Sequence, residues 1–202
     1  MGTRGAFGVV ADGVEKIGYN HFDSYPDGHG LDVLHWVRDV VTGGTESQVR
    51  EKAINLKYLD EDNVTPNQLK EFDAISGWDL AGHLDFGYII DASDFPYDGL
   101  FCEWGYIVDF DNRQLEVYQG GVQNLTPIGR FKNGGVNDQG YRAISLVAYF
   151  SFDHLPSDED FLDQTAGPVC CECSYRKPID FSNENEDGTI TCDWCLDEKA
   201  TV

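Results

Sequence analysis

The sequence predicts an α+β fold in which a largely antiparallel sheet carries a helical layer, followed by a small module built around four cysteines. Three features support this prediction: a hairpin pattern at the start of the chain, helical periodicity over residues 31–74, and strand-rich segments between residues 84 and 152. Strands that bracket a block of helices are typical of α+β domains. We therefore expect an α+β domain over residues 1–166 and the cysteine module over residues 167–202.

The first expected element is a β-hairpin. Two short runs rich in β-branched and aromatic residues, 6–10 and 14–20, flank Asp12-Gly13, a pair suited to the positive φ angles of a tight turn. The segment that follows, residues 21–28, is dense in turn formers and hydrogen-bonding side chains. Loops with this composition tend to carry function, so this loop is a candidate site.

Three helices are expected next. Four apolar residues recur at helical spacing in the first of them, over residues 31–41: Leu31, Leu34, Val37 and Val41. Thr45 and Gln48 have the form of a capping box that opens a second helix, which we expect to end near Leu59. The same device at residues 65–68 opens a third helix, with a proline at its first position.

Strands dominate the second half of the α+β domain. Aromatic and β-branched residues predict strands over 84–90, 105–110 and 115–118. Residues 143–152 are apolar on both faces, as expected for a strand covered on both sides, so we place this strand at the centre of the sheet. A short acidic helix should follow, beginning after Ser157.

The charge of the chain limits the classes of partner. The 202 residues include 36 Asp and Glu against 14 Lys and Arg, a formal net charge of −22. Such a surface repels a phosphate backbone at long range, so we expect no direct nucleic-acid binding. Three explanations of the acidity stay open: an acidic proteome, an acidic face that meets a basic partner protein, and mimicry of nucleic acid.

The hydropathy pattern predicts a soluble, cytoplasmic protein without a membrane segment. The longest nearly apolar run, residues 144–150, is far shorter than the ~18 residues of a membrane helix. No basic, apolar leader opens the sequence. In a reducing compartment the six cysteines are expected to stay reduced or to bind metal.

The strongest chemical signal is at the C-terminus. Cys170-x-x-Cys173 and Cys192-x-x-Cys195 enclose 18 residues, a spacing typical of a zinc ribbon in which two knuckles hold one tetrahedral zinc ion. Four protein ligands close the coordination sphere, so the zinc would be structural. Two disulfides or free thiols are the alternative, and Cys171 is a less suitable substitute in the first pair. The module has 8 acidic residues, which favours contact with protein over nucleic acid.

Six residues near the hairpin form the candidate ligand-binding or catalytic loop: Thr3, Arg4, Asn20, His21, Asp23 and Tyr25. Thr3 is placed like the nucleophile of hydrolases in which a free α-amine acts as base for the adjacent side chain. Removal of Met1 would expose Gly2, so this role requires further processing. In the structural alternative, Thr3 and Arg4 pair with other strands, and Tyr25 packs in the core or half-buried. Asp23 and Tyr25 then organise the turn through backbone hydrogen bonds, with Asp23 as a side-chain cap.

Other reactive residues have plainer interpretations. Cys102 is a lone thiol that we expect to be buried. His83, Asp85, Asp91 and Asp94 match no motif with metal-ligand spacing, so we interpret this segment as a solvated acidic loop. His21 and His29, the two histidines of the polar loop region, are expected to have hydrogen-bonded structural roles.

Several separated segments resemble one family. The opening GTR, the segment YNHFDSYPDGHG, the segment FCEWGYIVDFDNRQLEVYQGG and the segment SFDHLPSDEDF are similar to proteins of unknown function found in bacteriophages, bacteria and fungi. The resemblance covers roughly residues 2–165. It implies a phage-like setting, in which small acidic proteins often act by binding a host protein, and the cytoplasm of that host as the location. It implies no catalytic residues.

Two functions therefore stay open. The first is a phage-type acidic interaction protein that binds and modulates a host protein, with a structural zinc. The second is a hydrolase of the N-terminal-nucleophile type, or a small-ligand-binding protein, with a pocket around Thr3 and residues 20–25. A convergent pocket that holds these side chains would favour the second function. Side chains committed to hydrogen bonds within the turn would favour the first.

Overall fold

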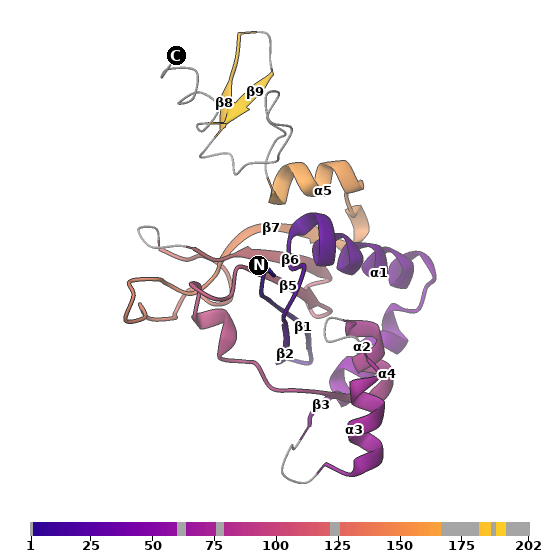
Figure 1. Ribbon diagram of the computed structural model, residues 1–202. Helices are drawn as coiled ribbons and strands as arrows, with labels where there is room; N and C mark the ends of the chain where they lie inside the picture. Colours follow the sequence, from indigo (N-terminus) through magenta and orange to yellow (C-terminus); the bar gives the residue numbers. More distant parts are fainter. Residues whose placement is uncertain are drawn as a thin grey trace. The chain divides into compact units, whose positions relative to one another are not determined.

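The computed structural model describes residues 2–59, 64–75, 79–121, 126–166, 182–186 and 189–192. The fold of this part of the chain is α+β, as predicted (Figure 1). The chain divides into two compact units, Met1–Leu155 and Pro156–Val202, and each is described by itself. Within the described residues, no helix combines the length and apolar character that a membrane span requires.

Helices and strands alternate in blocks along the chain. The helices are α1 (Leu31–Thr42), α2 (Glu46–Asn55), α3 (Pro66–Asp73), α4 (Leu80–Phe86) and α5 (Asp158–Thr165). The strands of the main sheet are β1 (Gly5–Ala11), β2 (Val14–Asn20), β5 (Trp104–Asp109), β6 (Gln114–Gln119) and β7 (Ser145–Ser151). Two short pairs complete the described strands: β3 (Lys57–Tyr58) with β4 (Tyr88–Ile89), and β8 (Ser182–Glu184) with β9 (Ile190–Cys192).

The main sheet is mixed and has the order β2-β1-β5-β6-β7. Its hairpin pairs β1–β2 and β5–β6, and the pair β6–β7, are antiparallel, whereas β1 and β5 are parallel. The parallel pair arises because the chain leaves the first hairpin, builds the helical layer and returns beside β1. A parallel neighbour requires such a long crossover connection.

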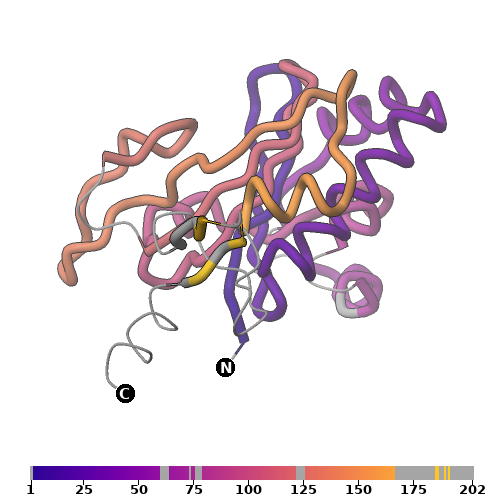
Figure 2. The backbone as a smooth tube through the Cα atoms, turned by 90° about the horizontal axis from the view of Figure 1, so that it is seen from above, coloured from indigo at the N-terminus to yellow at the C-terminus, as the bar shows by residue number. Residues whose placement is uncertain are grey.

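The two faces of the sheet have different covers (Figure 2). Phe7 of β1 points toward the helical side, where its ring meets those of His29 and His83 at 5.7 Å each. Ala6 and Val10 point to the other side and join a buried cluster that includes Phe131 from the segment between β6 and β7. Alternation along β1 therefore divides the core into a helical half and a loop-covered half.

The first hairpin forms as predicted and is held by a residue from the second. Asp12 and Gly13 have φ angles of 55° and 73°, as a tight two-residue turn requires. The carboxylate of Asp111 accepts hydrogen bonds from their backbone nitrogens at 2.9 and 2.7 Å. The Gly13 N–H is the main cause that lowers the pKa of Asp111, with Arg50 adding a favourable charge. The two hairpins are thus joined at their turns.

The helix-capping predictions had mixed outcomes. Thr65 accepts a hydrogen bond from the Gln68 backbone and Gln68 reaches back to the Thr65 backbone, so this capping box is confirmed. Ser157 caps α5 through the Asp160 backbone, also as predicted. The box at Thr45 was wrong, because its hydroxyl donates to the Val40 carbonyl at the end of the preceding helix. Because the connection between α1 and α2 is short, the Thr45 hydroxyl reaches the end of α1 and does not cap α2.

Two strand predictions were wrong. Residues 84–90 were expected to be one strand, but α4 runs to Phe86 and only Tyr88–Ile89 are extended. Asp79 opens this helix by accepting a hydrogen bond from Gly82 at 2.9 Å, and Gly87 closes it with a φ of 82°. The strand expected at the centre of the sheet is β7, which lies at the sheet's edge, with Tyr149 64 % exposed. β7 thus has apolar residues on both faces although it lies at the edge of the sheet and is partly exposed.

Candidate functional site

The six predicted loop residues gather at one end of the main sheet, where β1 begins and β2 ends. They do not form a single convergent group. Thr3 and Asn20 are buried, Arg4 is half-buried, and His21, Asp23 and Tyr25 are exposed. The loop therefore has an inner polar core and an outer surface, and the two have different chemistry.

Asn20 is the centre of the inner core. Its amide nitrogen donates to the Phe22 carbonyl at 2.6 Å and to the Ser24 hydroxyl at 2.8 Å, and lies 3.3 Å from Nδ1 of His29. Its amide oxygen accepts from the Phe22 backbone at 3.3 Å. An amide with this many partners organises the turn and has little capacity left for a substrate.

Ser24 ties the loop to the sheet, a role that the sequence did not reveal. Its carbonyl accepts a hydrogen bond from the Tyr106 hydroxyl at 2.9 Å, and its backbone nitrogen donates to the Thr3 carbonyl at 3.3 Å. Complete burial is the main cause that raises the pKa of Tyr106 well above its ordinary value, so this hydroxyl stays a donor. Tyr106 is 82 positions from Ser24 in the chain, and no local sequence pattern could have paired them.

Thr3 lies beneath this loop. Its side chain is only 2 % exposed, and among the described residues Oγ1 has no hydrogen-bond partner although it is buried. A nucleophile must reach a substrate carbonyl, whereas this hydroxyl is covered by the loop that Asn20 holds in place. Thr3 Oγ1 could serve as the nucleophile of a hydrolase, but a substrate cannot reach it because it is buried.

Asp23 and Tyr25 shape the turn through their backbones. The Asp23 carbonyl accepts from the His29 nitrogen at 2.9 Å, and the Tyr25 carbonyl accepts from Gly28 and Gly30 at 3.1 and 3.2 Å. The expected side-chain cap was wrong: within the described part of the chain, the exposed Asp23 carboxylate makes no hydrogen bond. Tyr25 was expected in the core or half-buried; it is 49 % exposed, so the core position was wrong, whereas the predicted backbone hydrogen bonds are present.

The backbone conformation of Asp23 leads to a testable prediction. Its φ of 52° lies in the left-handed region, where glycine is unstrained and alanine is less favourable than aspartate. We expect Asp23→Gly to raise the free energy of unfolding by up to about 1 kcal/mol and Asp23→Ala to lower it by a similar amount. Urea unfolding of the two variants measures both signs. Equal destabilisation by both would instead indicate that the carboxylate itself stabilises the turn.

The outer surface of the loop is aromatic. The Tyr19 hydroxyl hydrogen-bonds to Nδ1 of His21, and the rings of His21 and Phe22 meet edge to face at 4.4 Å. The Phe22 ring lies so close to Gly2 that a Cβ there would come within 2.5 Å of it. On the other side of the first residues, the Arg4 guanidinium lies 4.9 Å from the centre of the Phe101 ring. We call Arg4, Tyr19, His21, Phe22 and Phe101 the end patch.

A second polar cluster, on the loop-covered side of the sheet, was not foreseen from the sequence. Arg130 donates to Asp109 at 2.7 Å and to Glu116 at 2.9 and 3.1 Å, and lies 3.5 Å from Glu15. Tyr118 adds a hydrogen bond to Glu116 at 2.6 Å. Asp109 is fully buried and Glu116 nearly so, so Arg130 compensates charges that the fold has removed from water.

The remaining candidate residues lie in environments that suit a structural role and not a reactive one. Cys102 is buried, as predicted, and burial raises the pKa of its thiol far above the range of a nucleophile. His83 is buried against Phe7 and its ring nitrogen lies 3.2 Å from the Tyr88 carbonyl, while exposed Asp85 pairs with Lys52. Within the part of the chain that the structure describes, no group of histidine, cysteine or carboxylate side chains could hold a metal ion.

The zinc prediction falls on the C-terminal segment. Cys170, Cys173 and Cys195 lie outside the described residues, and for Cys192 only the backbone, at the end of β9, is described. The antiparallel pair β8–β9 follows the first cysteine pair in the sequence and ends at Cys192, where Cys192 pairs with Ser182. Zinc binding by these four cysteines stays a prediction.

Comparisons with known proteins add no family or fold relative. Neither the family models, nor the curated proteins, nor the solved structures gave a match to this chain. Any functional assignment therefore depends on the geometry described above.

Proposed function

We propose that this chain is an acidic interaction protein that binds a basic segment of another protein through the end patch. The setting we propose, from the resemblance in the sequence, is a phage-type protein that modulates a host protein. The observation that supports binding is the exposure of the aromatic side chains of the end patch, near the start of β1 and the end of β2. Exposed aromatic groups in contact with one another are typical of protein interfaces.

Two phenylalanine side chains of the end patch are exposed to solvent. Phe22 is 61 % exposed and Phe101 is 43 % exposed, although both contact the backbone or side chains of the first residues. Burying a phenylalanine side chain is worth about 1.5–3 kcal/mol, so two such residues offer substantial binding free energy to a partner. Beside Phe22, the hydrogen bonds of Asn20 to the Phe22 backbone and the Ser24 hydroxyl constrain the loop. A preorganised patch loses little conformational entropy on binding.

The charge around the patch selects the partner. Asp23 and Asp27 are exposed in the same loop, and the whole chain has a net charge of −22. Lysine or arginine side chains next to an apolar residue would match this surface, since the cations would face the carboxylates and could also lie over the rings. An acidic partner or a nucleic acid would be repelled.

The hydrolase alternative fits less well. It requires a substrate to reach Thr3, whose side chain is buried, and free polar groups around it. Asn20 is instead committed to Phe22 and Ser24. The loop residues thus serve the turn, which favours the binding role.

The test uses an array of synthetic peptides that combine lysine or arginine with one large apolar residue. Each peptide has a neutral twin in which glutamine or citrulline replaces the basic residues. We expect the chain to bind a subset of the basic peptides and none of their twins, and the association rate to fall as salt is raised. The double variant Phe22→Ser, Phe101→Ser should weaken binding at least about tenfold, since interface aromatics often contribute more than 1 kcal/mol each.

The matched control is Ile54→Ser with Leu69→Ser. These residues are 43 % and 46 % exposed on α2 and α3, so the control removes a similar apolar area outside the end patch. Affinity should stay within about twofold of the unmodified chain. Equal binding by the patch variant and the unmodified chain, or equal binding of the neutral twins, would contradict the proposal.

A further inference from the structure

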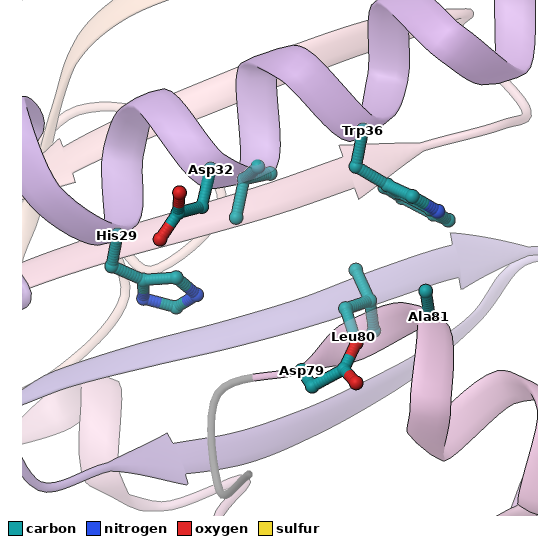
Figure 3. Close-up of a pocket in the computed structure, with 7 residues that line it drawn as sticks. His29, Asp32, Trp36, Asp79, Leu80 and Ala81 are labelled. Atoms are coloured by element: carbon teal, nitrogen blue, oxygen red, sulfur yellow. The ribbon is translucent and has the colours of Figure 1, made fainter. Parts of the chain in front are cut away.

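We propose that a small cavity between α1 and the start of α4 binds a short alkylguanidinium or alkylammonium ion. The cavity has a volume of about 60 Å³ and is lined by His29, Asp32, Val33, Trp36, Asp79, Leu80 and Ala81 (Figure 3). None of the end-patch residues lines it. The proposal is therefore independent of the proposed function, and either can fail while the other stands.

The lining residues are brought together by simple local geometry. Asp32 and Trp36 are four positions apart in α1 and so share one face of the helix, which Figure 3 shows turned toward the start of α4. Asp79 and Leu80 come from the first turn of α4, which Asp79 caps. The cavity thus lies between two helix beginnings, with one carboxylate contributed from each side.

The chemistry of the lining changes with depth. His29, Val33 and Leu80 are buried and form the floor, whereas Asp32 is exposed and Asp79 half-buried. The indole of Trp36 is half-buried and extends from the same helix as Asp32 (Figure 3). A ligand that matches this gradient has a small apolar end for the floor and a charged end at the rim.

The sign of the charge follows from the carboxylates. No lysine or arginine is among the described residues that line the cavity, while Asp32 and Asp79 both contribute negative charge. One carboxylate oxygen of Asp79 accepts from Gly82, and an aspartate in this position can still accept from a ligand. An indole face binds cations in addition, guanidinium most readily because it is planar. An anion would meet two like charges here.

The floor contributes one further polar group. Nδ1 of His29 lies 3.3 Å from the Asn20 amide nitrogen, so the imidazole is tied to the network that holds the loop.

The volume sets the size of the ligand. A water molecule occupies about 30 Å³ in the liquid, so the cavity accepts a group of only a few heavy atoms. Methylguanidinium and ethylammonium have this size, whereas a sugar or a nucleotide does not. The best ligands this small reach about 1.5 kcal/mol per heavy atom, so the Kd has a lower limit of a few micromolar (~7.5 kcal/mol) for methylguanidinium and of about 0.5 mM for ethylammonium.

The test is a titration of the whole chain with methylguanidinium, followed by amide and indole resonances. Methylurea, which has nearly the same shape without the charge, is the matched ligand control. We expect saturable shifts at the Trp36 indole N–H and at the Leu80 and Ala81 amides with methylguanidinium only. Equal shifts with methylurea, or no saturable shift at these three groups, would overturn the proposal.

Variants assign the binding to the carboxylates and the indole. Asp32→Asn with Asp79→Asn removes both charges while asparagine keeps the cap of α4, and should weaken binding at least about tenfold. Trp36→Leu should weaken it about three- to thirtyfold through the lost cation–π contact. Asp39→Asn, at an exposed carboxylate on α1 that does not line the cavity, should leave affinity within about twofold. Unchanged binding in the double variant would overturn the site.

The same titration separates the two sources of such a cation. A free alkylguanidinium can place its alkyl end on the floor, whereas an arginine side chain enters with its cation first. N-acetyl-arginine methylamide should therefore bind at least about threefold more weakly than methylguanidinium if the site serves a free small molecule. Tighter binding of the arginine derivative at the same three groups would identify a peptide side chain as the source.

Discussion

Replacing Arg130 by methionine is expected to lower the free energy of unfolding by about 3–5 kcal/mol, the largest effect that we predict for a single polar residue. Arg130 makes hydrogen-bonded ion pairs with Asp109 and Glu116 at 2.7 and 2.9 Å. Both carboxylates are almost entirely removed from solvent. Without the guanidinium they would remain buried as unpaired charges, which is far more costly than the loss of a surface ion pair. Urea denaturation measures the change.

Two further variants separate charge from packing. Adding Asp109→Asn and Glu116→Gln to Arg130→Met should recover part of the lost stability, because the unpaired charges are then absent. Arg113→Met is the surface control: Arg113 pairs with Glu46 and Asp153 in water, so its loss should be much smaller. If Arg113→Met and Arg130→Met were equally destabilising, the buried cluster would not have the role described here.

The same cluster should make stability depend on pH. Burial raises the pKa of Glu15 above its ordinary value of 4.5, while Arg130 opposes this and the Glu116 and Asp109 carboxylates add to it. The folded state therefore holds the Glu15 proton more tightly than the unfolded state, and stability falls as pH rises from about 4.5 through the raised pKa. Arg130→Met should steepen this fall because the opposing cation is gone. Glu15→Gln should flatten it.

Replacing Asn20 by alanine is the second large effect, with an expected loss of about 2–3 kcal/mol. The change removes the donor to the Phe22 carbonyl and the Ser24 hydroxyl, and the acceptor for the Phe22 backbone. Buried partners left unsatisfied cost about 1–3 kcal/mol each, and not all can turn to water. Hydrogen exchange should show faster opening of residues 21–30 in addition to the global loss.

Asn55→Ala is the control for Asn20→Ala. Asn55 is exposed on α2 and its amide donates only to the Glu51 carbonyl one turn earlier, so little change is expected. Asn20→Asp should be at least as harmful as Asn20→Ala, since an acceptor would then face the Phe22 carbonyl. A small effect of both Asn20 variants would show that the loop is held by other contacts and would weaken the argument that the end patch is preorganised.

Local sequence signals were reliable where the cause was local. Asp12-Gly13 turns because these two residues tolerate positive φ, and Thr65 caps α3 because its own hydroxyl reaches Gln68 three positions on. The same logic failed at Thr45, where the end of the preceding helix lies within reach of the hydroxyl. The helix still begins after Thr45, so the pattern located the helix start, but it predicts the side-chain hydrogen bond only when no nearer acceptor competes for the hydroxyl.

Sheet position could not be inferred from apolar content. β7 was expected at the centre because both of its faces are apolar, yet β1, β5 and β6 fill the middle of the sheet. Their burial patterns are nearly continuous, whereas Val147 and Tyr149 of β7 are exposed. An apolar run predicts that a strand forms, but whether the strand is buried depends on the strands and helices that pack beside it.

The candidate site was found in part from the sequence. The polar loop after β2 was correctly located, and Asn20 was among its named residues, because turn formers and amides concentrate there. The partners that define the site were not found from the sequence. Tyr106 contacts Ser24, and Phe101 contacts Arg4; both come from much later in the chain and reach these residues only when β5 pairs with β1. Arg130 and its carboxylates were missed for the same reason.

By itself the sequence determined the α+β class, the first hairpin, the beginnings of α1, α2, α3 and α5, and the strong negative charge. These depend on side-chain periodicity, backbone preference and composition, which act within a few residues or sum over the whole chain. Only the tertiary structure decided the parallel pairing of β1 with β5, the burial of Thr3, the grouping of the end patch and the pairing of Arg130 with three carboxylates. Each of these joins residues far apart in the chain, and distance in space is fixed by packing rather than by spacing in sequence.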